Sequence, residues 1–277
     1  MLFLDVLKAI FLGIIEGITE WLPISSTGHM ILVDEFIKLN ISEEFKELFL
    51  VVIQLGAILA VPVLFFDKLY PFSKNKNITE RKATLNLWVK VIVGVVPAAA
   101  IGFVFDDLLE EHFYNYVVVA AALIVYGIAF IIVEKLRSNK HERVDDVHDI
   151  SYLDALKIGA FQTLSLIPGT SRSGSTILGG RLFGVSRKAS AEFSFFMAIP
   201  IMLGASLLKI LKFILAGYSA TLDEIILLAV GIVVSFVVSI GIIRFLMDFV
   251  KRHDFKVFGI YRIILGVAVL LYFIFKN

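Results

Sequence analysis

Six long apolar stretches limit most strongly what this chain of 277 residues can fold into. A helix needs about 20 residues to cross the roughly 30 Å hydrocarbon core of a bilayer, and each stretch approaches or exceeds that length. Hydrophobic residues make up 58% of the chain and charged residues 18%, which is too apolar for an ordinary soluble domain. The sequence therefore predicts an all-α, polytopic membrane protein. Its six spans are residues 48–66, 87–105, 117–133, 193–215, 225–246 and 257–275.

Charge and cysteine content exclude several classes of function. The formal net charge is +1, whereas binding to a phosphate backbone needs a basic surface, so we expect no nucleic-acid partner. The absence of cysteine excludes disulfides, thiolate metal sites and a cysteine nucleophile. Because no small-residue cleavage site follows the first apolar stretch, we expect no removable signal peptide.

Two further apolar stretches, 5–38 and 152–190, are interrupted near their middle by proline, glycine and hydroxyl residues. The breaks fall at residues 23–28 and 168–174. Lipid does not tolerate the backbone polar groups that a break exposes, so each break must be buried in protein or face water. We therefore predict two re-entrant helix-loop-helix hairpins beside the six transmembrane helices.

Loop charge predicts the orientation, because lysine and arginine accumulate on the cytoplasmic side of a membrane. Acidic segments, assigned outside, are 34–47, 106–111 and 223–224, and basic segments, assigned inside, are 68–82, 135–143, 181–188 and 251–256. The signs alternate only if each interrupted stretch returns to its own side, the first outside and the second inside. Both termini then lie outside. Two full crossings per hairpin would give the same parity.

The two halves of the chain resemble each other at an offset of roughly 140 residues. Matched segments are 13–16 with 159–162, 23–26 with 168–171, and 54–62 with 192–200. One residue is deleted before the second proline, which pairs Ser26 with Ser171. Each half holds an odd number of crossings, so we predict a single membrane domain of two inverted repeats, about 1–145 and 146–277. The alternative is a likeness of composition between two interrupted apolar regions.

Glu16 and Glu20 precede the first break and share one helix face, because they are four residues apart. Two carboxylates in an apolar setting repel each other unless a cation or a proton intervenes. Magnesium is commonly held by one or two carboxylates, with water and substrate phosphate completing its shell. The pair therefore indicates a divalent metal site. The alternative is a pair of interfacial acids solvated from outside.

The first break continues through Ser25, Ser26, Thr27 and His29. Serines at this place are also ordinary caps of the following helix. His29 lies three residues from the candidate nucleophile Ser26, and its titration range suits proton transfer. The alternative for His29 is a hydrogen bond to a neighbouring helix.

The second break predicts a phosphate cradle. Glycine lets the backbone approach an anion, a helix start offers hydroxyl and N–H donors, and arginine matches phosphate oxygens with a charged fork. These groups are Gly169, Ser171, Arg172, Ser173, Gly174, Ser175 and Thr176. Ser175 stands where a P-loop requires lysine, which excludes a nucleotide site of that kind. As an alternative, the arginine pairs with Glu16 or Glu20 and only holds the halves together.

Converging breaks would join acids, hydroxyls and imidazole to a phosphate-binding arginine, so the expected substrate is a phosphate carried on a lipid. The rival function is a transporter or lipid flippase with alternating access, because inverted repeats with broken helices are typical of transporters. That function does not explain why the breaks also carry a hydroxyl, a histidine, an arginine and paired acids.

The motifs Glu16-xxx-Glu20, 25–29 and 168–176 resemble the signatures of the undecaprenyl-diphosphatase family, also called bacitracin-resistance proteins. The likeness covers nearly the whole chain, including 181–187 and 192–200. It implies a multi-pass enzyme of the bacterial plasma membrane that hydrolyses undecaprenyl diphosphate to undecaprenyl phosphate and phosphate. Such an enzyme recycles the lipid carrier of cell-wall synthesis, depends on a divalent cation and confers bacitracin resistance. Gln162 replaces an acid in the second repeat, which indicates one composite site.

These observations and the resemblance together define the expected site. Its catalytic residues are Glu20, Ser26, His29 and Arg172, its substrate ligands are Ser25, Thr27, Gly169, Ser171, Arg172, Ser173 and Thr176, and its metal ligands are Glu16 and Glu20. The cation is Mg²⁺ or Ca²⁺. Attack by Ser26 and attack by water both remain open, with His29 as base. We expect the reaction to take place on the outer side of the membrane, with membrane lipid around the protein. Whether the chain forms a homo-oligomer stays open.

Overall fold

The structure is a computed structural model that describes residues 2–113 and 115–276, with the side chains of residues 106–111 excepted. Helices dominate it, and an isolated bridge between Val144 and Val185 is the β pairing found in the described part. The helices are α1 (Leu2–Thr19), α2 (Ser26–Phe36), α3 (Glu43–Val52), α4 (Gln54–Leu64), α5 (Phe66–Leu69), α6 (Ile78–Phe113), α7 (Tyr116–Arg137), α8 (Tyr152–Thr163), α9 (Arg172–Leu182), α10 (Arg187–Leu215), α11 (Leu222–Phe249) and α12 (Lys256–Lys276). The all-α prediction is confirmed.

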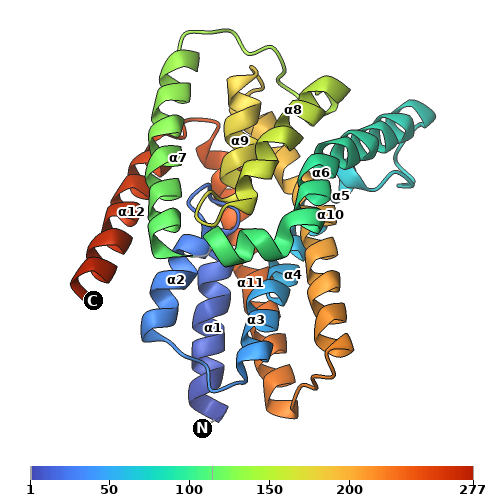
Figure 1. The fold of residues 1–277 in the computed structure, drawn as a ribbon. Helices are drawn as coiled ribbons and strands as arrows, with labels where there is room; N and C mark the ends of the chain where they lie inside the picture. Colours follow the sequence, from blue (N-terminus) through green and yellow to red (C-terminus); the bar gives the residue numbers. More distant parts are fainter. Residues whose placement is uncertain (1, 114, 277) are drawn as a thin grey trace.

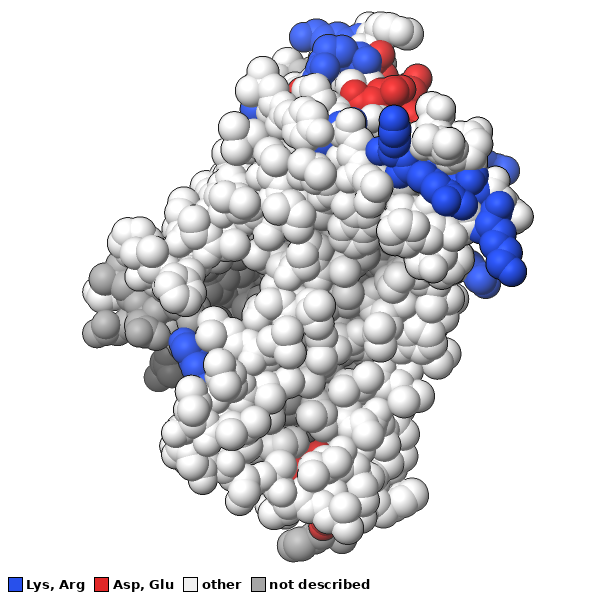
Figure 2. Space-filling view, turned by 90° about the vertical axis from the view of Figure 1, so that its right-hand side faces the viewer, with Lys and Arg blue, Asp and Glu red and all other residues white. Residues whose placement is uncertain are grey.

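Six helical segments of the described residues are long and apolar enough to cross a membrane, as predicted. They are the continuous pair α3 and α4, residues 78–105 of α6, and helices α7, α10, α11 and α12. Lys and Arg side chains gather toward one end of the face shown in Figure 2, and most of the remaining visible surface is uncharged. The chain is a multi-pass membrane protein.

The boundaries of three elements differ from the prediction. The acidic segment 106–111, expected in a loop, continues α6, because its leucine and glutamate residues favour a helix and it contains no proline. Its side chains lie outside the described residues. The span expected at 48–66 covers Glu43–Leu64 and is divided at Ile53 into α3 and α4. The second interrupted stretch ends with α9 rather than at residue 190, because Ser186 caps a new helix by accepting the backbone N–H of Ala189 at 3.2 Å.

The interrupted stretches form two helix pairs that approach the centre from opposite ends. Figure 1 shows α1 and α2 below the central loops, and α8 and α9 above them. Helices α2, α8 and α9 contain 11, 12 and 11 residues. At 1.5 Å per residue such helices measure only about 17 Å, which is too short to cross the hydrocarbon core. These lengths support the re-entrant hairpins, which stay a prediction.

Helix packing supports the predicted repeat. Helix α1 packs on α11 and α8 packs on α6, so each first hairpin helix contacts a span of the other half. Helices α7 and α12 meet through reciprocal glycines. A Cβ atom on Gly127 would lie 2.6 Å from the carbonyl oxygen of Gly259, and one on Gly259 would lie 2.7 Å from that of Gly127.

The cap geometry corrects the register of the repeat. Ser25 and Ser171 are the non-glycine residues with positive φ in the described chain, and both have φ 73°. Ser25 accepts the backbone N–H of Gly28, and Ser171 accepts that of Gly174, so each serine caps the helix after its break. Ser25 therefore corresponds to Ser171, and the predicted pairing of Ser26 with Ser171 is wrong. The capping serine fixes this turn in both repeats, whereas the positions of the two prolines relative to that serine differ by one residue.

Candidate functional site

An ion pair joins the two breaks. Arg172, the first residue of α9, donates to Oε1 of Glu20 from Nη2 at 3.1 Å and from Nε at 3.3 Å. The side chains are 11% and 8% exposed, so the pair is almost removed from solvent. The structure thus brings together the two charged residues that the sequence predicts at the site. The same contact also fits the alternative in which the arginine holds the halves together.

Ser26 contacts the other oxygen of the same carboxylate. Its Oγ donates to Oε2 of Glu20 at 3.1 Å, and the residue is half-buried at the first position of α2. The helix N-terminus favours negative charge at this point. A hydroxyl in this setting has a proton acceptor and a favourable field, and both suit a nucleophile.

His29 is hydrogen-bonded through both ring nitrogens. Nδ1 lies 2.7 Å from the carbonyl oxygen of Ser25, and Nε2 lies 2.7 Å from the hydroxyl of Tyr261 on α12. A carbonyl only accepts, so Nδ1 carries a proton. These contacts agree with the alternative of a histidine bonded to a neighbouring helix. Its function as a base stays a prediction.

Glu16 lies one helical turn before Glu20 and is 1% exposed. Its Oε1 atom has no hydrogen-bond partner in the described structure. A buried carboxylate without a partner is costly, and a cation or a proton removes that cost. The described residues offer no metal-binding group of three or more acidic or histidine side chains. Glu16 and Glu20 nevertheless fit a magnesium-like ion, which uses one or two carboxylates together with water and phosphate.

Two hydroxyls of the expected cradle contact protein groups. Ser173 Oγ donates to the backbone carbonyl of Glu20 at 3.0 Å and so ties the second break to the first. Thr176 is fully buried, and its Oγ1 donates to Ser194 Oγ at 2.7 Å. The geometry gives Ser173 and Thr176 bracing contacts, and their function as substrate ligands stays a prediction.

The remaining predicted ligands have mixed surroundings. Gly169 has φ +89°, and a Cβ there would lie 2.5 Å from the carbonyl oxygen of Val119. Its close approach is therefore to α7 rather than to an anion, because the packing of that helix already fills the space. Ser25 and Ser171 cap helices, as the ordinary interpretation expects, and Thr27 is half-buried beside Ser26.

Arg262 on α12 was missed by the sequence analysis. It is fully buried, and its guanidinium donates to the carbonyl of Pro23 at 3.2 Å and to those of Gly169 and Thr170 at 2.9 and 2.8 Å. One side chain thus links the backbones of both breaks. An arginine in the middle of the apolar stretch 257–275 is the signal that identifies it, because a charge at that depth is costly unless it is functional or well bonded.

Ser194 and Trp21 complete the surroundings of Arg172. The carbonyl of Ser194 accepts from Nη1 of Arg172 at 2.8 Å, and the guanidinium carbon lies 5.8 Å from the centre of the Trp21 ring. Trp21 is fully buried and meets Phe195 edge to face. These contacts hold the arginine in addition to its ion pair with Glu20.

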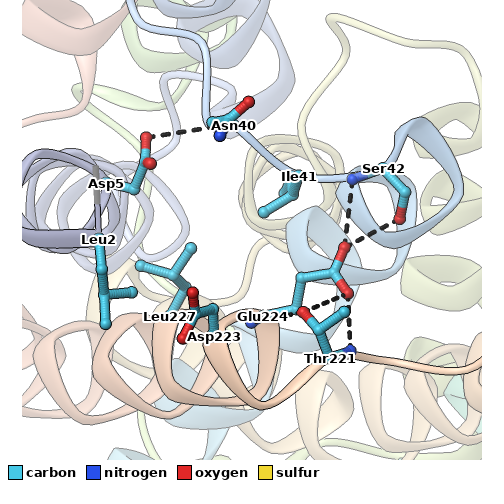
Figure 3. Close-up of a pocket in the computed structure, with 9 residues that line it drawn as sticks. All are labelled: Leu2, Asp5, Asn40, Ile41, Ser42, Thr221, Asp223, Glu224 and Leu227. Atoms are coloured by element: carbon cyan, nitrogen blue, oxygen red, sulfur yellow. Dashed lines mark hydrogen bonds between the residues drawn. The ribbon is translucent and has the colours of Figure 1, made fainter.

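A hollow of about 260 Å³ lies away from the breaks, near the starts of α1, α3 and α11 (Figure 3). Its buried acids are occupied: Asp5 accepts the backbone N–H of Asn40, and Glu224 accepts from Ser42 and Thr221. None of the predicted site residues lines it. The candidate site is therefore the meeting point of the two breaks.

Comparison with known proteins identifies the family of the chain. An undecaprenyl-diphosphatase of Enterococcus faecalis is 58% identical over 276 residues, which cover 100% of both chains. Undecaprenyl-diphosphatase 1 of Clostridioides difficile is 60% identical over 270 residues, 98% of this chain and 97% of the relative. An undecaprenyl-diphosphatase of Acetivibrio thermocellus is 58% identical over 271 residues, 98% of each chain. The family described as bacitracin resistance protein BacA matches residues 9–268, and the chain belongs to that family.

Proposed function

We propose that this chain is an undecaprenyl-diphosphatase that hydrolyses undecaprenyl diphosphate to undecaprenyl phosphate and phosphate. The observation that carries the proposal is the shared carboxylate of Glu20, which contacts the guanidinium of Arg172 and the hydroxyl of Ser26 at once. An anion-binding guanidinium, a hydroxyl and a carboxylate from the two breaks meet there. Family membership and the names of the relatives support the same reaction, with recycling of the cell-wall lipid carrier and bacitracin resistance as its consequences.

Arg172 would bind the diphosphate and stabilise the charge that spreads over the transferred phosphoryl oxygens, since phosphoryl transfer is catalysed mainly by positioning and electrostatics. Ser26 Oγ would attack the terminal phosphorus, or orient a water that does so. The bond from that phosphorus to the bridging oxygen then breaks, and undecaprenyl phosphate leaves. In the serine route, the hydroxyl of Ser26 already donates to Glu20 at 3.1 Å, and His29 stays the predicted base. A phosphoserine would subsequently be hydrolysed by water.

A divalent cation fits this site through Glu16 and Glu20. The unpartnered Oε1 of Glu16 supports that assignment. When bound, Mg²⁺ or Ca²⁺ would neutralise charge on the diphosphate oxygens. Without a cation, the protein contributes the positive charge of Arg172 and the N-terminal end of α2.

The placement of charge supports a bacterial plasma membrane protein with both termini outside. The basic segments around residues 140, 185 and 253 lie at the end of Figure 1 opposite to the N-terminus. Reciprocal helix packing supports two inverted repeats of about 1–145 and 146–277. We expect the reaction to face outward, on the side from which α1 and α2 enter. A homo-oligomer stays a prediction.

Phosphate release tests the function. The purified protein in detergent is given a long-chain polyprenyl diphosphate, with and without a chelator. We expect phosphate release by the wild type, none by Arg172→Ala, and near-normal release by Arg244→Ala, an exposed arginine of α11 that serves as the matched control. A lipid transporter or flippase, the rival function, would release no phosphate. Release by Arg172→Ala at the wild-type rate would refute the assignment of the cradle.

A further inference from the structure

Tyr261 of α12 lies against His29 of α2, 232 residues away in sequence. Its hydroxyl is 2.7 Å from Nε2, and the two rings are stacked with centroids 5.6 Å apart and planes 10° from parallel. Since Nδ1 donates to the carbonyl of Ser25, Nε2 of the neutral ring holds the lone pair. The Tyr261 hydroxyl therefore donates to the nitrogen that can take up a proton.

The backbone next to each anchor of the His29 ring is held by further contacts. Ser25 is buried in its left-handed conformation as the cap of α2. Tyr261 precedes Arg262, whose guanidinium is bonded to three backbone carbonyls of the two breaks. The imidazole is thus oriented by the first break on one side and by α12 on the other.

We propose that Tyr261 is a positioning residue that holds the imidazole of His29 in one orientation, an inference that rests on the proposed phosphatase function. The hydroxyl serves both protonation states. It donates to neutral Nε2 and accepts from protonated Nε2.

Tyr261→Phe is the informative variant, because it keeps the stacked ring and removes only the hydroxyl. Loss of one hydrogen bond to the base should lower kcat by about three- to tenfold, with KM changed less than about twofold. Tyr272→Phe on the same helix is the matched control, with an unchanged kcat expected. In the His29→Ala background, Tyr261→Phe should lower kcat no further. An unchanged kcat, a rise in KM alone, or an additive loss in that background would overturn the proposal.

Nitrogen NMR of ¹⁵N-histidine protein in detergent reads the contact directly and independently of turnover. The chain has 5 histidines, and His29→Gln identifies the resonances of His29. We expect protonated Nδ1 in the wild type, and in Tyr261→Phe a shifted Nε2 resonance with Nδ1 still protonated. An Nε2 resonance that does not move would overturn the proposal. If the wild type releases no phosphate, the proposed function fails, while this measurement still tests the Tyr261 contact.

Discussion

Glu20 accepts a hydrogen bond from Arg172 across 152 residues of sequence, and both side chains are nearly buried. The contact connects the end of the first apolar hairpin helix to the start of α9. Each partner would be an unpaired charge without the other. The same ion pair therefore contributes to the stability of the fold and to the arrangement of the candidate site.

Arg172→Ala should abolish phosphate release and also destabilise the protein by about 3 to 5 kcal/mol, because it leaves the buried carboxylate of Glu20 unpaired. Glu20→Gln in the same chain removes that charge, so the double variant should recover much of the stability and none of the activity. Thermal unfolding in detergent and phosphate release measure the two effects. A double variant as unstable as Arg172→Ala would contradict the argument.

Ser26→Ala should lower kcat by at least about 100-fold, because it removes the candidate nucleophile. It should change the melting temperature little, because Ser26 is half-buried and alanine is the best helix former. Ser25→Ala should instead lose about 1 kcal/mol of stability, since Ser25 caps α2 through the N–H of Gly28. Steady-state kinetics and thermal unfolding of the two neighbours separate chemistry from capping. A Ser26→Ala enzyme with full activity would exclude attack by the serine.

Arg262→Ala should destabilise the chain by about 3 kcal/mol or more, because three buried carbonyls of the two breaks lose their donor. Arg262→Lys should be intermediate, since a single ammonium group cannot reproduce the planar fork. Thermal unfolding in detergent measures both. Equal melting temperatures for the wild type and Arg262→Ala would show that the breaks do not depend on this link.

Gly127→Ala should separate α7 from α12, because the added Cβ would stand 2.6 Å from the carbonyl oxygen of Gly259. We expect a loss of about 1 to 3 kcal/mol from overpacking. Gly241→Ala is the control: nothing lies within 4 Å of its Cβ position, so the same change should stabilise α11 by a few tenths to about 1 kcal/mol. Opposite shifts in melting temperature are the expected result. A shift of the same sign for both would refute the close contact.

A chelator should abolish phosphate release by the wild type, and added Mg²⁺ or Ca²⁺ should restore it. Glu16→Gln keeps the shape of the side chain and removes a carboxylate whose Oε1 has no partner in the described structure. It should therefore raise the cation concentration needed for half-maximal rate by about tenfold or more, without a loss of stability. Unchanged phosphate release by the wild type in the presence of a chelator would exclude a metal at this site.

The sequence predicts the six spans, but it does not predict which groups the hydroxyls of the second break contact. Long apolar stretches encode the spans locally, and Glu20, Arg172 and Ser26 are recognisable because charged and hydroxyl groups are rare in such stretches. The contacts of Ser173 and Thr176 depend instead on which backbone carbonyl or hydroxyl lies nearest in the folded chain. Local composition does not contain that information.

Two other differences have physical causes of the same kind. The sequence analysis aligned the breaks on their prolines, but the left-handed cap residues Ser25 and Ser171 define the equivalent turns. An arginine in an apolar stretch marks Arg262 as unusual, but it says nothing about the carbonyls that Arg262 reaches in the two breaks. Both features become visible only when segments far apart in sequence are placed side by side.

The link through Arg262 also bears on the order of synthesis. Helix α12 leaves the ribosome after both breaks, yet it carries the donor that joins them. A nascent chain that ends after α11 already contains Glu20, Ser26 and Arg172. It lacks Arg262, which bonds to the backbones of both breaks. The candidate site can therefore acquire all of its contacts only after α12 has been synthesised.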